Sequence, residues 1–170
     1  VADKVNFVWV DEDWAANFGN VEVTGAKVAQ EGIEKFVAEV KKDAKVEVAF
    51  YGGSFTGIEP ELQEKLLGAA YDYIKEKKVH SIRISTRPDY INKSILKMLK
   101  KYKVKTIELG VQSTNDYILS RAGRGHTFED VVKASKLIRW YGFTLGHQMM
   151  VGLPESTALD ELNTAKDLIK

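Results

Sequence analysis

The stretch Lys45–Gly57 reads KVEVAFYGGSFTG and joins an apolar run to a turn that contains two glycines. The run is rich in β-branched and aromatic residues, which favours a strand. The glycines allow a tight turn, and Pro60 then suits the first turn of a helix. Apolar residues recur at helical spacing through Pro60–Lys77. The stretch therefore predicts a strand, a turn and a helix, which together form one βα unit.

The same order of strand, turn and helix recurs five times along the chain. Apolar runs predict strands at about Val5–Val10, Lys45–Tyr51, Ser81–Thr86, Lys105–Gly110 and Thr144–Val151. Helical periodicity predicts helices at Ala29–Lys42, Pro60–Lys77, Ile91–Tyr102, Phe128–Tyr141 and Ala158–Ile169. Thr127, and either Ser156 or Thr157, are suited to cap the last two helices. No linker or low-complexity tract interrupts the repeat, so residues 1–170 are predicted to form a single domain.

Five consecutive βα units predict an α/β fold with a parallel sheet and right-handed crossovers. The sheet is either part of a (β/α) barrel or an open, doubly wound, flavodoxin-like sheet. The apolar runs are expected to be covered on both faces, as in most parallel sheets. In either architecture, ligands bind at the carboxyl ends of the strands. Function is therefore expected on that one rim.

Small or hydrogen-bonding residues gather at this predicted rim. Gly52-Gly53-Ser54 follows the second strand, Ser85-Thr86-Arg87 ends the third, Gln112-Ser113 follows the fourth and Gly152-Leu153-Pro154 follows the fifth. Each feature also has a purely structural interpretation. The glycine pair could form a tight turn, Arg87 could pair with Asp89 at the surface, and Gln112 could cap a loop. The neighbouring Met149-Met150 could pack in the core. Their convergence on one rim favours a ligand site over packing alone. The ligand class is a small nucleotide or another anion.

Composition narrows the function classes. Hydrophobic residues make up 44% and charged residues 29% of the chain, and 25 Lys and Arg against 24 Asp and Glu give a net charge of +1. This balance is ordinary for a globular protein and gives no general signal for nucleic acid or membrane binding. No apolar run reaches the length of a membrane span. The expected location is the cytoplasm. The chain has no cysteine, which excludes disulfides and thiolate ligands to zinc or iron.

The segment from about Val46 to Lys170 resembles the radical S-adenosylmethionine (SAM) superfamily. The resemblance rests on YGGSFTG at 51–57, ISTRPD at 84–89, ELGVQS at 108–113 and VGLP at 151–154. It is greatest to relatives of the elongator catalytic subunit and weaker to oxygen-independent coproporphyrinogen oxidase. The resemblance implies a partial barrel for residues 43–170 and roles in SAM binding for eight residues. Gly52, Gly53 and Ser54 would meet the amino group, Ser85 and Gln112 the ribose, Arg124 the carboxylate, and Gln148 and Met149 the ribose and adenine.

The departure from the family lies near the front of the chain. The family places Cys-x3-Cys-x2-Cys after the first strand to hold a [4Fe–4S] cluster, whereas residues 11–20 here read DEDWAANFGN. Carboxylates do not replace thiolates on this soft cluster. Residues 1–42 are therefore interpreted as an atypical or replaced first βα unit. Asp11 and Asp13 could hold a hard cation, but a solvated loop after a buried strand is the favoured interpretation of these residues.

These observations predict a catalytically disabled radical-SAM-like scaffold, engineered or truncated, that keeps residual affinity for SAM, a nucleotide or an anion and binds no iron–sulfur cluster. One alternative is part of a radical SAM enzyme whose cluster ligands come from elsewhere. Another is a structural module without a ligand. The chain stops where a sixth strand is expected, so an exposed sheet edge is predicted to favour self-association. His80, His126 and His147 stand at different kinds of position, which argues against a hydrolytic triad.

Overall fold

The computed structural model describes residues 6–10, 21–39, 45–51 and 54–169. Its five strands are β1 (Asn6–Val10), β2 (Val46–Phe50), β3 (Ser81–Thr86), β4 (Val104–Gln112) and β5 (Thr144–Met149). Its helices are α2 (Val21–Glu39), α3 (Pro60–Lys75), α4 (Lys93–Lys101), α5 (Asp116–Arg121), α6 (Phe128–Trp140) and α7 (Ala158–Ile169), with short 3-10 helices η1 (Phe55–Gly57) and η2 (Pro88–Tyr90). The prediction of five βα units is confirmed in this part of the chain.

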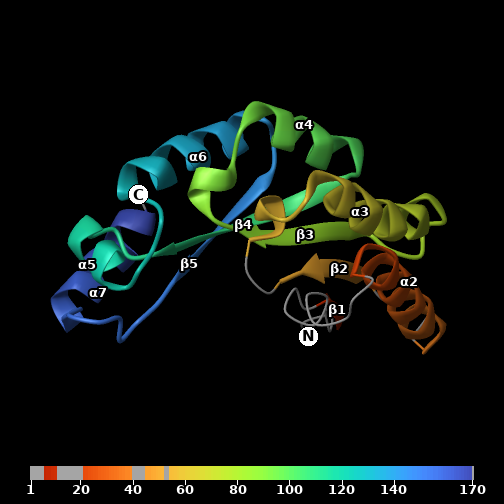
Figure 1. Cartoon of the computed structure of the whole chain (residues 1–170), viewed down its shortest axis with the longest axis horizontal. Helices are drawn as coiled ribbons and strands as arrows, with labels where there is room; N and C mark the ends of the chain where they lie inside the picture. Colours follow the sequence, from red (N-terminus) through yellow and green to blue (C-terminus); the bar gives the residue numbers. More distant parts are fainter. Residues whose placement is uncertain (1–5, 11–20, 40–44, 52–53, 170) are drawn as a thin grey trace.

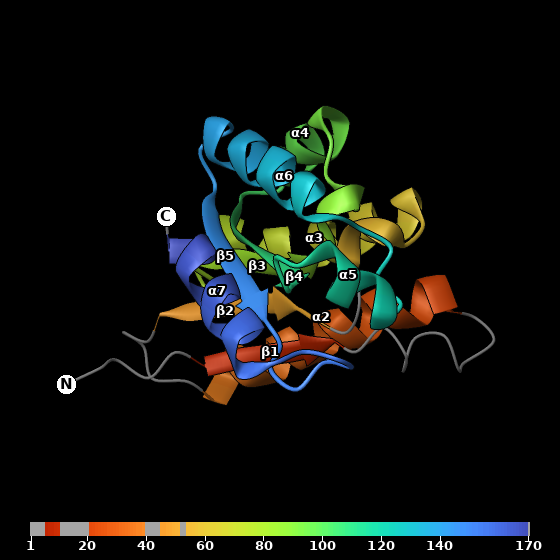
Figure 2. The ribbon, with the colours of Figure 1, turned by 90° about the vertical axis from the view of Figure 1, so that its left-hand side faces the viewer.

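The sheet is parallel throughout, and its strand order is β1-β2-β3-β4-β5. A doubly wound sheet reverses direction at a switch point and places helices on both faces. A sequential order with right-handed crossovers places the connecting helices on one face instead. Figures 1 and 2 show α2, α3, α4 and α6 along the outer side of a curved sheet. The fold is therefore of the partial-barrel type, and the flavodoxin-like alternative is wrong.

The hydrophobic core lies between the sheet and these helices. Alternate strand residues such as Val48, Ile84 and Leu109 are fully buried against helix residues that include Leu67 and Leu99. Burying one such side chain contributes about 1.5–3 kcal/mol. Intervening strand residues point to the other face, and several of them are polar or charged, such as Glu47, Arg83 and Glu108. The expectation that helices would cover both faces is therefore wrong: in the described residues, the second face carries an ion-pair network instead.

Local signals explain the helix ends. Thr127 caps α6 and forms a capping box with Asp130, as the sequence predicts. At the start of α7, Thr157 Oγ1 donates to Asp160 Oδ2 at 2.5 Å and accepts from the Asp160 amide at 3.3 Å. These caps fix where each helix leaves the rim of the sheet. Helix α5, which the sequence did not predict, has Asn115 as its N-cap.

At the far end of the sheet, β5 has no second strand neighbour among the described residues. Self-association through this edge stays a prediction. None of the helices in the described part of the chain has both the length and the apolar character needed to cross a bilayer.

Candidate functional site at the strand ends

A cavity of about 330 Å³ lies at the carboxyl ends of strands β2 to β5. This volume is at the lower end of the range for small-molecule sites. The cavity brings together five of the eight residues that the sequence nominates: Ser54, Ser85, Gln112, Arg124 and Gln148. These five residues come from four different βα units. The predicted convergence on one rim is therefore present in the fold.

The other three nominated residues have different positions. Gly52 and Gly53 lie outside the described residues. Met149 ends β5 but does not line the cavity. Four lining residues were not nominated: Tyr51, Thr86, Arg87 and Gly110. Their signal was present in the sequence, because Tyr51, Thr86 and Gly110 each end a predicted strand and Arg87 follows Thr86 directly.

Gln112 has an unusual backbone that aims it at the cavity. The pairing of β4 with β5 shifts register between Gly110 and Gln112, so Val111 forms a bulge. Gln112 has a φ of 68°, the left-handed region that glycine favours. Its Nε2 lies 2.9 Å from where a Cβ on Gly110 would stand, so a side chain at position 110 would push the flexible amide of Gln112 away from its present place. Bulges and backbone strain cluster where a side chain must be positioned for function.

We expect Gln112→Gly to be more stable than Gln112→Ala by about 1 kcal/mol, because alanine keeps the left-handed strain that glycine relieves. Denaturant unfolding followed by circular dichroism measures this difference. The same pair of substitutions at Gln148, within regular strand β5, is the control. There glycine should be the less stable variant, since it loses more backbone entropy. A Gln112→Ala variant as stable as Gln112→Gly would contradict a strained backbone.

Two arginines line the cavity, and they differ in what their nitrogens contact. Arg87 donates from Nε and Nη2 to the carboxylate of Asp89 at 3.0 and 2.8 Å, and its guanidinium lies over the ring of Tyr90. Among the described residues, the one hydrogen-bond partner of Arg124 is the weakly accepting Sδ of Met150, which Nη2 contacts. Its Nε is buried and forms no hydrogen bond within this part of the chain. Arg124 is therefore the arginine with unused donor capacity toward an anion.

Gln112 likewise has a buried Oε1 that finds no hydrogen-bond partner in the described ranges of the chain. Leaving a buried polar atom unpaired costs about 1–3 kcal/mol. Such atoms are rare in folded proteins, and each one calls for an explanation such as an absent ligand. Together with the Arg124 nitrogen, the cavity region holds one unpaired acceptor and one unpaired cationic donor. A ligand that carries both hydroxyls and a carboxylate satisfies both groups.

A polar network lies on the face of the sheet that points away from helices α2, α3, α4 and α6, and it leads into this cavity. Arg83 on β3 donates to Glu47 on β2 at 2.8 Å and to Glu108 on β4. Gln148 on β5 donates to Glu108 at 2.6 Å, and Ser85 contacts Gln148 at 3.4 Å. The network thus crosses four strands and fixes the side chain of Gln148. Burial, and next to it the charge of Glu108, raises the pKa of Tyr51, which keeps this phenol protonated.

The three histidines do not converge. His80 precedes β3 at the opposite rim, where its Nδ1 accepts from the Val46 amide at 3.3 Å. His147 packs on the helix side against Ser135, and burial lowers its pKa. His126 is buried near the strand ends, with Nε2 3.1 Å from the Val111 carbonyl oxygen. Ser135 and His147 form a hydroxyl–histidine pair, but neither residue lines the cavity at the strand ends, so the described residues give no such pair at the candidate site.

Metal binding has no support in the described residues, where no three His, Asp or Glu side chains group in a way that could hold an ion. Asp11 and Asp13, the suggested cation ligands, lie outside the described residues. The cysteine-free sequence at 11–20 lies outside them as well.

Comparisons with known proteins agree with the geometry. A family model described as "Radical SAM superfamily" matches residues 17–168. The tRNA uridine(34) acetyltransferase of Methanocaldococcus infernus is 30% identical over 130 residues, which is 66% of this chain and 24% of the relative. Human Elongator complex protein 3 is 32% identical over 127 residues, covering 65% of this chain and 23% of the relative. The chain thus spans about a quarter of the length of these relatives.

Solved structures show the same fold. The archaeal Methanocaldococcus infernus Elp3 with an N-terminal deletion aligns with a TM-score of 0.74 and 25% identity, over 98% of this chain and 42% of that one. Coproporphyrinogen III oxidase from Escherichia coli aligns with a TM-score of 0.59 and 19% identity, over 84% of this chain and 34% of that one. The second likeness supports the partial-barrel fold alone.

Proposed function

Because the chain belongs to the radical SAM superfamily, we propose that it is a SAM-binding domain that lacks the means to cleave SAM by itself. The observation that carries this proposal is the cavity at the strand ends, near which Gln112 Oε1 and Arg124 Nε are buried and form no hydrogen bond with any described residue. The family resemblance assigns these same two residues to the ribose and the carboxylate of SAM. Both atoms therefore keep hydrogen-bonding capacity that the described part of the chain does not use, as expected of groups that bind a ligand.

The chemistry of these groups fits SAM. The amide oxygen of Gln112 accepts a hydrogen bond from a ribose hydroxyl, and the guanidinium of Arg124 donates to a carboxylate. Ser85 and Gln148, held by the network around Glu108, present further polar atoms along the same wall. The side chains therefore bind and orient the two polar ends of the ligand. When bound, SAM supplies an activated sulfonium centre.

The iron–sulfur cluster does not fit this chain. Its ligands are thiolates, and none of the 170 residues is a cysteine. We interpret the front of the chain as a segment whose cluster ligands were lost or replaced, by engineering or by natural divergence. The supporting observation is that strand-end residues of four βα units match the family, whereas DEDWAANFGN at 11–20 does not.

A second candidate is a part of a radical SAM enzyme whose cluster ligands come from outside this chain. The observation in its favour is that the chain spans about a quarter of its curated relatives. A third is a structural module that binds no ligand. The three candidates differ in what they predict for SAM and for iron.

We expect isothermal titration with SAM to show saturable one-to-one binding, and anaerobic reconstitution with iron and sulfide to give no stoichiometric cluster. Absorbance and electron paramagnetic resonance measure the cluster. Cluster formation at one equivalent would contradict the proposal and favour the second candidate. Titration without saturable heat, repeated by NMR, would favour the structural module.

A further inference from the structure

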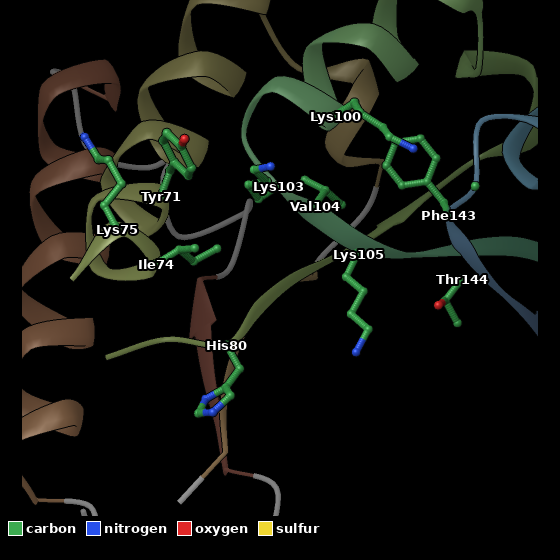
Figure 3. A pocket seen from close by; sticks show the side chains of 11 residues that line it. Tyr71, Ile74, Lys75, His80, Lys100, Lys103, Val104, Lys105, Phe143 and Thr144 are labelled. Atoms are coloured by element: carbon green, nitrogen blue, oxygen red, sulfur yellow. The ribbon is translucent and has the colours of Figure 1, made fainter. Parts of the chain in front are cut away.

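A larger cavity, of about 640 Å³, lies at the opposite rim, where strands β3, β4 and β5 begin. Figure 3 shows its lining, to which helices α3 and α4 and the turn before β5 contribute. Its charged lining residues are all basic: Lys75, Lys100, Lys103 and Lys105, with His80 beside them. No acidic side chain is among the lining residues. The nearly neutral chain thus concentrates positive charge at one hollow.

Lysines at this rim also have a structural explanation. Helices α3, α4 and α6 end here, and cations stabilise the negative end of a helix dipole. Lys75 pairs with Asp72 at 2.7 Å, and Lys100 donates to the carbonyl of Tyr141 after α6. The carboxyl end of each of these helices carries roughly half a negative charge, and Asp72 carries one full negative charge. Together these negative charges do not balance the four lysines, so the rim keeps an excess of positive charge.

Lys103 and Lys105 are not accounted for in this way. Neither ammonium group has a hydrogen bond or ion pair with any residue in the described ranges. His80 accepts at Nδ1 from the Val46 amide, so the neutral ring carries its hydrogen on Nε2. The wall thus offers two free ammonium groups and one imidazole donor. No described acidic residue among those lining the cavity competes for them.

We propose that this cavity binds an oligophosphate group, such as that of a nucleoside triphosphate. Lysine is a compact point charge that suits phosphate oxygens. The lysines come from α3, α4, the turn after α4 and β4, and they are spread along the cavity, as Figure 3 shows. This spread suits an extended anion with several charges. The site is separate from the SAM cavity and goes beyond the function proposed for that cavity.

Inorganic triphosphate is the probe for isothermal titration, at 50 and 300 mM salt. We expect saturable binding that weakens as salt rises. Combining Lys103→Gln with Lys105→Gln should lower the affinity about tenfold or more and flatten the salt dependence. The control is Lys77→Gln. Lys77 is exposed, follows α3 at the same rim and shares the positive φ of Lys103, but it does not line the cavity.

Further probes identify the source of the phosphates. ATP should bind about as tightly as triphosphate, because the lining recognises phosphates. If octathymidylate bound much more tightly than triphosphate, the natural source of the phosphates would be a nucleic-acid backbone, and the site itself would be upheld. Three results would each overturn the proposed site. The first is the absence of saturable triphosphate binding, and the second is an equal loss of triphosphate affinity in the Lys77 and Lys103/Lys105 variants. The third is binding of ATP without binding of triphosphate. SAM titration of the same variants should be unchanged, which separates this failure from failure of the SAM site.

Discussion

Replacing Arg83 by methionine is expected to lower the free energy of unfolding by about 3 kcal/mol, because it leaves two carboxylates unpaired on one sheet face. Arg83 lies between Glu47 and Glu108, and their side chains are only 11% and 15% exposed. Burial alone would lower the pKa of Arg83, but its hydrogen bonds to Glu108 and Glu47 outweigh burial and raise it. The guanidinium is therefore held in its charged form between the two carboxylates.

The matched control is Arg121→Met. Arg121 also pairs with a glutamate, Glu155, at 2.6 Å, but its side chain is 56% exposed. A pair so exposed contributes less than about 1 kcal/mol. Urea unfolding followed by circular dichroism measures both variants. Adding Glu47→Gln and Glu108→Gln to Arg83→Met should recover part of the loss, since the unpaired charges are then removed. If Arg83→Met cost no more than Arg121→Met, the network would not stabilise the fold.

Local sequence patterns predicted the individual strands and helices, but not how the strands are arranged in the sheet. Strand Ser81–Thr86 and helix Ala158–Ile169 have the predicted bounds, because strong local patterns and caps define them. Strand order is not local, and apolar runs alone did not distinguish a partial barrel from a doubly wound sheet. Polar residues such as Glu47 and Arg83 within otherwise apolar runs were the missed sign that one face of the sheet carries an ion-pair network.

The sequence predicted the part of the candidate site that is formed by residues at and just after the strand ends. Ser54, Ser85, Gln112, Arg124 and Gln148 come together because parallel strands end on one rim. The bulge at Val111, which extends β4 to Gln112, depends on pairing with β5 and had no local signal. Helix α5 was missed because its six residues are too few for a clear periodicity. The basic cavity was missed because its lysines are dispersed in sequence and meet only in the fold.

Arg124→Ala is expected to weaken SAM binding by about 10- to 100-fold, since a hydrogen bond to a charged group contributes about 1.5–3 kcal/mol. The unpaired Nε of Arg124 is the donor that a carboxylate would engage. Arg87→Ala is the control at the same cavity. Its guanidinium is already held by Asp89 and Tyr90, so its loss should weaken SAM binding severalfold less.

The ligand provides the second half of this test. Methylthioadenosine keeps the adenine and ribose but has no amino-acid carboxylate, so Arg124→Ala should leave its affinity unchanged within about twofold. Gln112→Ala should weaken both ligands, because both carry the ribose. The two variants and two ligands form a cycle measured by isothermal titration. If Arg124→Ala lowered the affinity for SAM and for methylthioadenosine equally, Arg124 would only maintain the shape of the cavity. The carboxylate of SAM would then be bound by another residue.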